Sequence, residues 1–186
     1  MKDSKVRRVG TAVVQTGWGW IGIAWSRQGL IVVTLPQPTK AAALDQIPLA
    51  SDHVPLTPAG LDVTVLADKL RRYFDGEAEI LDELLDPTIG TPFQRRVWAI
   101  TRAIPRGQTR TYGEIAREAS SPGAARAVGQ AMARNPWPVI VPCHRVVGSD
   151  RSLTGFGGGL DMKREMLIME GAITNLTPSS KDGMMV

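Results

Sequence analysis

Residues 9–36 read VGTAVVQTGWGWIGIAWSRQGLIVVTLP, and this stretch decides the class of the fold. β-Branched and aromatic residues dominate it, and two turn sequences, TGWG and SRQG, interrupt it. Extended runs separated by glycine-containing turns are typical of neighbouring antiparallel strands. The stretch therefore predicts an antiparallel three-stranded sheet.

Helical patterns follow the predicted sheet. Residues 39–47, TKAAALDQI, have a helical composition, and a second helix is indicated by apolar residues at helical spacing, namely Leu61, Val65, Leu66, Leu70 and Phe74. Prolines and polar residues make 50–60 a loop between them. The first half is thus an α+β domain at residues 1–88, and EILDELLDPTIGTP at 79–92 is the expected linker.

The second half is expected to be mostly helical. An apolar helical face runs from Phe93 to Ile104 and stops at Pro105 and Gly107. Thr111 and Glu114 have the spacing of a capping box, which predicts a short helix over TYGEIAREA at 111–119.

A second short helix is expected over GAARAVGQAMAR at 123–134. Ser121 is its predicted N-cap and Pro122 its predicted first residue. Two short helices joined by a tight turn are typical of a helix-turn-helix. The fold class is therefore α+β, with a three-stranded sheet and helices followed by a mostly helical domain that carries a helix-turn-helix.

Composition and charge narrow the function classes. The chain has 186 residues, a net charge of +4 and no apolar run long enough to cross a bilayer, so we expect a cytoplasmic protein with no membrane partner. The amino terminus lacks the apolar core of a secretory signal. One cysteine rules out an internal disulfide, and with only two histidines no metal site is expected.

Arginines gather in one part of the chain. Ten of them lie between Arg95 and Arg151, against three acidic residues. This excess is a candidate electrostatic footprint for nucleic acid, although a solvated arginine-rich surface explains it equally well.

The helix expected at 123–134 is crowded with small residues, among them Ala124, Ala125, Ala127 and Gly129. Base-edge recognition needs long hydrogen-bonding side chains, so this helix is suited to approaching DNA closely rather than to reading it. Arg126 is its long cation near the start, and a lone arginine among small residues can enter a base stack. The alternative is that the alanines pack against the first helix and Arg126 is solvated.

Cys143 lies in the sequence VIVPCHRVVG at 139–148. The apolar residues before it predict a buried extended segment, and a buried cysteine is most often inert. However, polar residues such as His144 and Arg145 cost free energy at the end of a core strand unless they are hydrogen-bonded or used. His144 can activate the thiol by lowering its pKa. Neighbouring side chains on a strand point to opposite faces, so the contact can run through a water instead of being direct.

These segments resemble the O6-alkylguanine-DNA alkyltransferases, also called methylated-DNA–protein-cysteine methyltransferases. The resemblance covers residues 90–171 nearly continuously through GTPFQRRVW, IPRGQTRTYGEIA, AARAVGQAMARNP, PCHRVV and GFGGGLDMKREMLIMEG. It implies a carboxy-terminal DNA-binding and alkyl-acceptor domain at 89–171, after a ribonuclease H-like domain at 1–88. Residues 172–186 are expected to form a flexible tail.

The resemblance also implies roles for individual residues. Cys143 accepts the alkyl group of O6-alkylguanine in a single-turnover reaction without a cofactor. O4-Alkylthymine is a further candidate substrate. His144 and Glu170 draw the proton from the thiol through a water. Tyr112 donates to the guanine leaving group, and Lys163 is a cation near both.

Further residues are implied to bind DNA or to form the pocket. Arg126 enters the duplex from which the damaged nucleotide has left, while the helix occupies the minor groove of double-stranded DNA. The implied DNA-binding residues are Arg126, Ala124, Ala125, Ala127, Gly129, Thr111 and Tyr112. The implied pocket residues are Tyr112, Asn135, Pro138, Val146, Phe156, Gly157 and Gly158. The protein is expected to act as a monomer, and cooperative binding along DNA is left open.

Three alternatives remain at this point. Alkyltransferase-like proteins bind lesions without chemistry, but they generally replace the acceptor cysteine that is present here. A helix-turn-helix regulator needs base-reading side chains on its second helix. A cysteine hydrolase would turn over and would leave the basic helix-turn-helix unexplained.

Overall fold

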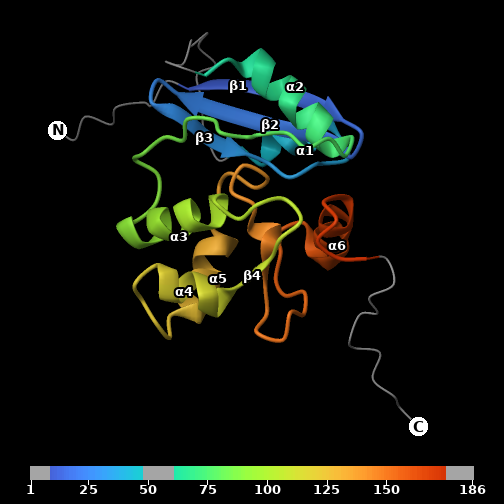
Figure 1. Cartoon of the computed structure of the whole chain (residues 1–186). Helices are drawn as coiled ribbons and strands as arrows, with labels where there is room; N and C mark the ends of the chain where they lie inside the picture. The colour runs from blue at the N-terminus through green and yellow to red at the C-terminus, as the bar shows by residue number, and fades with distance from the viewer. Residues whose placement is uncertain (1–8, 48–60, 175–186) are drawn as a thin grey trace, which may run out of the picture. The chain divides into compact units, whose positions relative to one another are not determined.

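The computed structural model of the chain describes residues 9–47 and 61–174 (Figure 1). Its contacts define two compact units. The first holds the described residues up to Ile89 together with Pro136–Ile140, and the second holds Gly90–Asn135 and the described residues from Val141 onward. The expected loop at 50–60 and residues 175–186 of the expected tail lie outside the described residues.

The first unit is built on an antiparallel sheet of order β1-β2-β3. The strands are β1 Gly10–Thr16, β2 Gly19–Ser26 and β3 Gly29–Val33, which confirms the sheet expected from residues 9–36. Gly19 and Gly29 begin the second and third strands at φ of 130° and 134°. A Cβ atom at Gly29 would lie 2.5 Å from the Leu84 carbonyl oxygen, so this turn requires glycine.

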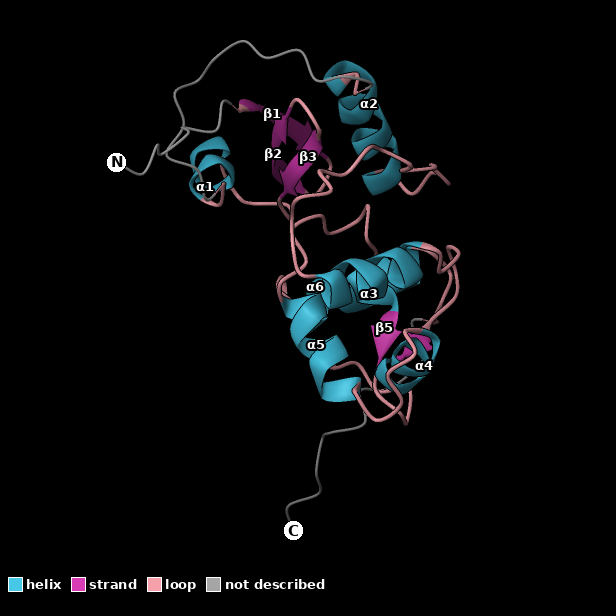
Figure 2. Ribbon diagram, turned by 90° about the vertical axis from the view of Figure 1, so that its left-hand side faces the viewer, coloured by secondary structure: helices cyan, strands magenta, loops and turns pink. Residues whose placement is uncertain are grey.

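Two helices, α1 Lys40–Asp45 and α2 Val63–Phe74, lie on opposite faces of this sheet (Figure 2). Helix α2 begins at Asp62, whose carboxylate accepts hydrogen bonds from the backbone N–H groups of Thr64 and Val65. Its buried face includes Leu66, Leu70 and Phe74 of the predicted set, whereas Val65 is 48% exposed.

Two segments outside the meander complete the first unit. The expected linker at 79–92 is hydrogen-bonded to β3 at the edge of the sheet. The Leu30 N–H donates to the Leu84 carbonyl at 2.8 Å, and the Asp86 N–H donates to the Leu30 carbonyl at 2.9 Å. From the other end of the chain, Val33 N–H donates to the Pro136 carbonyl at 2.9 Å. Trp137 Nε1 donates to the Leu30 carbonyl at 2.9 Å. Nothing in the local sequence pattern indicates that 136–140 belongs to this unit.

The second unit is helical with one small parallel ladder. Its elements are α3 Pro92–Arg102, β4 Arg110–Thr111, α4 Tyr112–Glu118, α5 Ala125–Ala133, the 3₁₀ helix η1 Cys143–Arg145, β5 Val146–Val147 and α6 Gly159–Met169. Helices α3, α4 and α5 pack together (Figure 1), and Trp98 Nε1 donates to the Ala131 carbonyl at 2.9 Å. The predicted capping box of Thr111 and Glu114 at the start of α4 is confirmed.

Two local predictions for this unit are wrong, and one element was not predicted. Helix α5 begins at Ala125 with Ala124 as N-cap, because residues 122–124 form a turn instead of the first helical turn expected at Ser121 and Pro122. Residues 139 and 140 lie in a turn and residue 141 in a bend, instead of an extended segment, and Val139 has a φ of 75°. The ladder of β4 with β5 was not foreseen, since strands of two residues carry no periodicity.

None of the helices in the described ranges is both long and apolar enough to span a membrane.

Candidate active site around Cys143

Cys143 opens the 3₁₀ turn η1 and is 8% exposed. Its N–H donates to the Val141 carbonyl at 2.7 Å, and Arg145 N–H donates to the Pro142 carbonyl at 2.9 Å. Asn135, after the end of α5, donates from Nδ2 to the same Val141 carbonyl at 2.8 Å. The turn therefore ties the end of α5 to the backbone just before the thiol.

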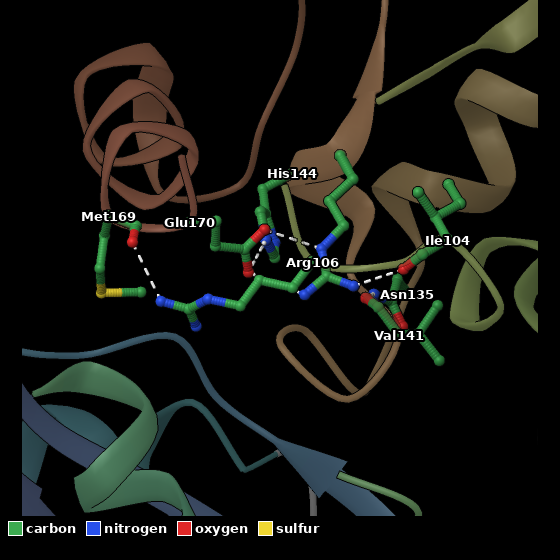
Figure 3. Close-up of polar contacts among 8 residues, drawn as sticks. Ile104, Arg106, Asn135, Val141, His144, Met169 and Glu170 are labelled. Atoms are coloured by element: carbon green, nitrogen blue, oxygen red, sulfur yellow. Dashed lines mark hydrogen bonds and ion pairs between the residues drawn. The ribbon is translucent and has the colours of Figure 1, made fainter. Parts of the chain in front are cut away.

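A buried network of polar side chains connects η1, which begins at Cys143, with the end of α6 (Figure 3). His144 Nε2 lies 3.0 Å from Glu170 Oε1, and both side chains are fully buried. Arg145 holds Glu170 through Nε to Oε2 and through Nη2 to Oε1, each at 2.8 Å, and also donates to the Ile104 carbonyl. Two parallel N–H···O bonds of this kind fix a carboxylate in one orientation.

Electrostatics set the protonation states in this network. Burial alone would raise the pKa of Glu170, but hydrogen bonds from His144 and Arg145 hold the pKa of that carboxyl well below its usual range. Burial lowers the pKa of His144, and the Glu170 carboxylate only partly opposes this. At neutral pH the carboxylate is ionised and the imidazole is neutral. An ionised carboxylate only accepts hydrogen bonds, so the proton of the neutral ring lies on Nε2 and Nδ1 keeps its lone pair.

The thiol itself is not pre-ionised. Burial raises the pKa of Cys143, although the Asn135 side chain and the charge of Lys163 oppose that effect. The protonated thiol predominates at neutral pH, so a nucleophilic reaction requires a base that takes its proton.

Lys163 is fully buried on α6 and links two segments. Its Nζ donates to the Val146 carbonyl at 2.6 Å and to the Thr154 carbonyl at 2.7 Å. Burial lowers the pKa of Lys163 to about 8, and only the ionised form of Cys143 opposes that effect. Lys163 therefore connects β5 with the loop that precedes α6.

A pocket of about 960 Å³ opens onto Cys143. The residues implied by the resemblance that line it are Thr111, Tyr112, Ala125, Arg126, Gly129, Cys143, Phe156 and Gly157. The implied residues outside its lining are Ala124, Ala127, Asn135, Pro138, Val146, Gly158, His144, Lys163 and Glu170. His144, Lys163 and Glu170 are buried, while Pro138 belongs to the segment assigned to the first unit. Tyr112 contacts Thr154, whose Oγ1 lies 3.4 Å from its hydroxyl oxygen.

The pocket lining is basic. Exposed arginines from three segments take part in it, namely Arg117, Arg126 and Arg151. Hydrogen bonds from Thr111 lower the pKa of Glu114, the acidic residue in the lining, so its charge offsets one of the three. The remaining excess favours an anionic ligand at the mouth of the pocket.

Two arginines have structural roles at the site that the sequence analysis did not assign. Arg145 orients Glu170, and Arg106 donates from Nη2 to the Met169 carbonyl at 3.0 Å at the end of α6 (Figure 3). Arg145 carried a signal, because a polar residue in a buried segment needs hydrogen bonds. Arg106 carried none, since its partner lies 63 residues away in the chain.

Known proteins resemble the chain in sequence. Residues 92–172 match the family described as 6-O-methylguanine DNA methyltransferase, DNA binding domain. Methylated-DNA–protein-cysteine methyltransferases of Shigella flexneri and Mycobacterium bovis are 51% identical over 106 residues and 53% identical over 103 residues. These matches cover 57% and 55% of this chain, and in each case 62% of the relative.

Solved structures extend the likeness to both units. The crystal structure of the Mycobacterium tuberculosis O6-methylguanine methyltransferase has a TM-score of 0.69 and 38% identity, covering 88% of this chain and 93% of its own. The crystal structure of Mycobacterium tuberculosis OGT in complex with DNA has a TM-score of 0.70 at 38% identity, covering 89% and 93%. An O6-methylguanine DNA methyltransferase from Methanococcus jannaschii has a TM-score of 0.62 at 28% identity, covering 94% and 100%. The chain therefore belongs to the family of the O6-alkylguanine-DNA alkyltransferases, the methylated-DNA–protein-cysteine methyltransferases.

Proposed function

We propose that this protein repairs DNA by moving an alkyl group from O6 of guanine to its own Cys143, once per molecule. The observation that carries the proposal is a thiol in a basic pocket, followed directly in the chain by His144, which pairs with Glu170 in the interior. The names of its relatives support the same chemistry. O4-Alkylthymine is a further candidate substrate of the same reaction type.

The reaction begins with the proton of the thiol. Because burial keeps Cys143 protonated, neutral His144 accepts that proton through a water, and Glu170 stabilises the imidazolium that forms. The sulfur then attacks the alkyl carbon. A carbon–sulfur bond forms as the carbon–O6 bond breaks, and the electron pair stays on guanine.

Tyr112 compensates the charge that develops on the leaving guanine by donating a hydrogen bond to N3. The tyrosine lines the pocket and contacts Thr154, whose carbonyl accepts from Lys163. Lys163 therefore acts through this contact as well as through its charge near the thiol. The guanine anion takes up one proton, and the His144 imidazolium returns the thiol proton through water, so the protons balance. The products are an S-alkylcysteine and unmodified guanine, and nothing in the described site regenerates the thiol.

DNA binding is assigned to the second unit. Helix α5 exposes Arg126, Arg134 follows its last residue, and the helix is otherwise rich in small residues, which permits close approach to the floor of the minor groove. Arg126 fills the space that the damaged nucleotide leaves when it rotates into the pocket. We propose that the protein acts on double-stranded DNA as a cytoplasmic monomer.

Mass spectrometry tests the proposal directly. After incubation with a duplex that contains O6-methylguanine, the Cys143 peptide is expected to gain one methyl group, stoichiometrically and without turnover. The Cys143→Ala variant is the control and is expected to gain none. An unmodified thiol combined with tight binding of the lesion would instead identify a damage-recognition protein without chemistry.

A further inference from the structure

Arg151 occupies an unusual backbone position in the loop between β5 and α6. Its φ is 64°, in the left-handed region where glycine is favoured and a long side chain is strained. The surrounding turn is well defined, because Arg151 N–H donates to Gly148 at 3.0 Å and Gly148 N–H donates to Ser152 at 2.9 Å. Asp150 Oδ1 accepts from Ser152 N–H at 3.0 Å and from its hydroxyl at 2.6 Å. Folding of this turn alone would be served better by glycine at position 151.

The contacts of the Arg151 side chain do not account for the strain. The guanidinium lies 3.2 Å from the Thr109 carbonyl oxygen, 3.4 Å from Thr109 Oγ1 and 3.4 Å from Glu114 Oε1. Hydrogen bonds to charged groups are normally shorter, and the side chain is 56% exposed to water. Exposed pairs of this kind contribute little to stability. The contacts direct the guanidinium without satisfying all of its donors.

The Arg151 guanidinium can contact a ligand in the pocket, because Arg151 lines the pocket that contains Cys143. Arg126 lines the same pocket from α5, so the two cations reach it from different segments. A nucleotide that enters the pocket brings a phosphate on each side of its sugar. A guanidinium has a planar fork of donors that matches phosphate oxygens, and Arg126 is already assigned to the space inside the duplex.

We propose that Arg151 binds a backbone phosphate next to the extruded nucleotide, and so holds the damaged strand while Cys143 reacts. The inference rests on the function proposed above. In the complex, the phosphate replaces the long contacts to Thr109 and Glu114. Glu114 remains held by the Thr111 N–H at 2.6 Å, so the helix cap is independent of this exchange.

The test is the Arg151→Gly variant, because glycine is the residue that the backbone at 151 favours. Its melting temperature is expected to equal or exceed that of the wild type. Its affinity for a duplex containing O6-methylguanine is expected to fall roughly tenfold, as for the loss of one hydrogen bond to a charged group. The slope of log affinity against log salt is expected to fall by about one, as for the loss of one phosphate contact.

The matched control is Arg27→Gly, which removes an exposed turn arginine from the first unit. It is expected to leave both the affinity and the salt slope at their wild-type values. The rate of Cys143 alkylation on duplex, relative to that with free O6-benzylguanine, should fall in Arg151→Gly alone. If Arg151→Gly matches the wild type in affinity and slope while the wild type alkylates itself, the phosphate role is refuted and the repair function stands. If the wild type neither binds the duplex nor gains an alkyl group, both are refuted.

Discussion

Arg145 and Glu170 form a bidentate ion pair with two N···O distances of 2.8 Å, in which the carboxylate that faces His144 is held by both of its oxygens. The arginine directly follows the histidine in sequence, whereas the glutamate ends a helix 25 residues later. The pair therefore fixes the position of Glu170 against His144.

Replacing Arg145 tests whether this orientation matters for the reaction. Arg145→Lys keeps the charge but loses the planar fork, so we expect alkylation by free O6-benzylguanine to slow roughly tenfold. Arg145→Met also removes a charge that lowers the pKa of His144, so the acidic limb of its pH–rate profile should move to higher pH. Arg145→Lys should slow the alkylation without shifting the acidic limb of the profile. Equal rates in all three proteins would show that the ion pair is only structural.

The pH dependence of the reaction follows from His144. Its folded pKa lies below the ordinary value of 6.5, so the neutral, basic form persists below pH 6.5 and is lost only in more acidic solution. The rate with free O6-benzylguanine should therefore hold from pH 7 to 6.5 and then decline. Glu170→Gln removes the charge that stabilises the imidazolium, and we expect it to react at least about tenfold more slowly. A rate that halves at pH 6.5 or above would contradict this assignment.

The free energy of unfolding should also decrease as the pH falls, because protonation favours the unfolded chain. The unfolded chain binds the proton of His144 more readily than the folded protein does, so stability is lost as the pH falls below 6.5. The loss should continue as Glu170, whose pKa is held low in the fold, becomes protonated first in the unfolded chain near pH 4.5. Urea titrations across this range measure it.

Arg126→Ala tests extrusion of the damaged nucleotide. Extrusion costs a few kcal/mol, which the inserted side chain offsets, so reaction with a duplex substrate should slow far more than reaction with the free base. Single-turnover rates with O6-methylguanine duplex and with free O6-benzylguanine give the comparison. Equal losses on the two substrates would refute the role in extrusion.

The size of the pocket predicts which alkyl groups are accepted. Its volume is about 960 Å³ and Gly157 in its lining adds no side chain, so O6-benzylguanine should inactivate the wild type. Gly157→Trp narrows the pocket and should protect against benzylguanine more strongly than it slows repair of O6-methylguanine. A wild type that resists benzylguanine would reject the prediction.

Gly90 offers a stability test away from the reaction. Its φ is 79°, and a Cβ atom there would lie 2.3 Å from the Trp98 ring, which must move to accept it. Gly90→Ala should lower the free energy of unfolding by about 2–4 kcal/mol, from backbone strain and overpacking together. Gly123→Ala is the control, because its φ is 86° but its Cβ would meet nothing within 4 Å. The difference between the two variants isolates the clash with Trp98, and equal losses would contradict it.

Local patterns predicted most of the secondary structure. The sheet of residues 10–33, the helix α2 and the capped start of α4 follow from periodicity and capping chemistry, which act within a few residues. The prediction failed at Ser121 and Pro122, where the cap signal was present but the chain makes a turn before α5. It failed again before Cys143, where an apolar run looked like a buried strand and instead turns.

The sequence by itself determined the residue types of the site, because the segments around Cys143 carry a specific resemblance over 82 positions at 90–171. Only the tertiary structure decided how they meet. Glu170 reaches His144 across 26 residues, Lys163 reaches Val146 across 17, and Arg151 turns into the pocket through a left-handed backbone. The reason is physical: burial and long-range hydrogen bonds set these contacts and the protonation states, and neither is encoded in any local pattern.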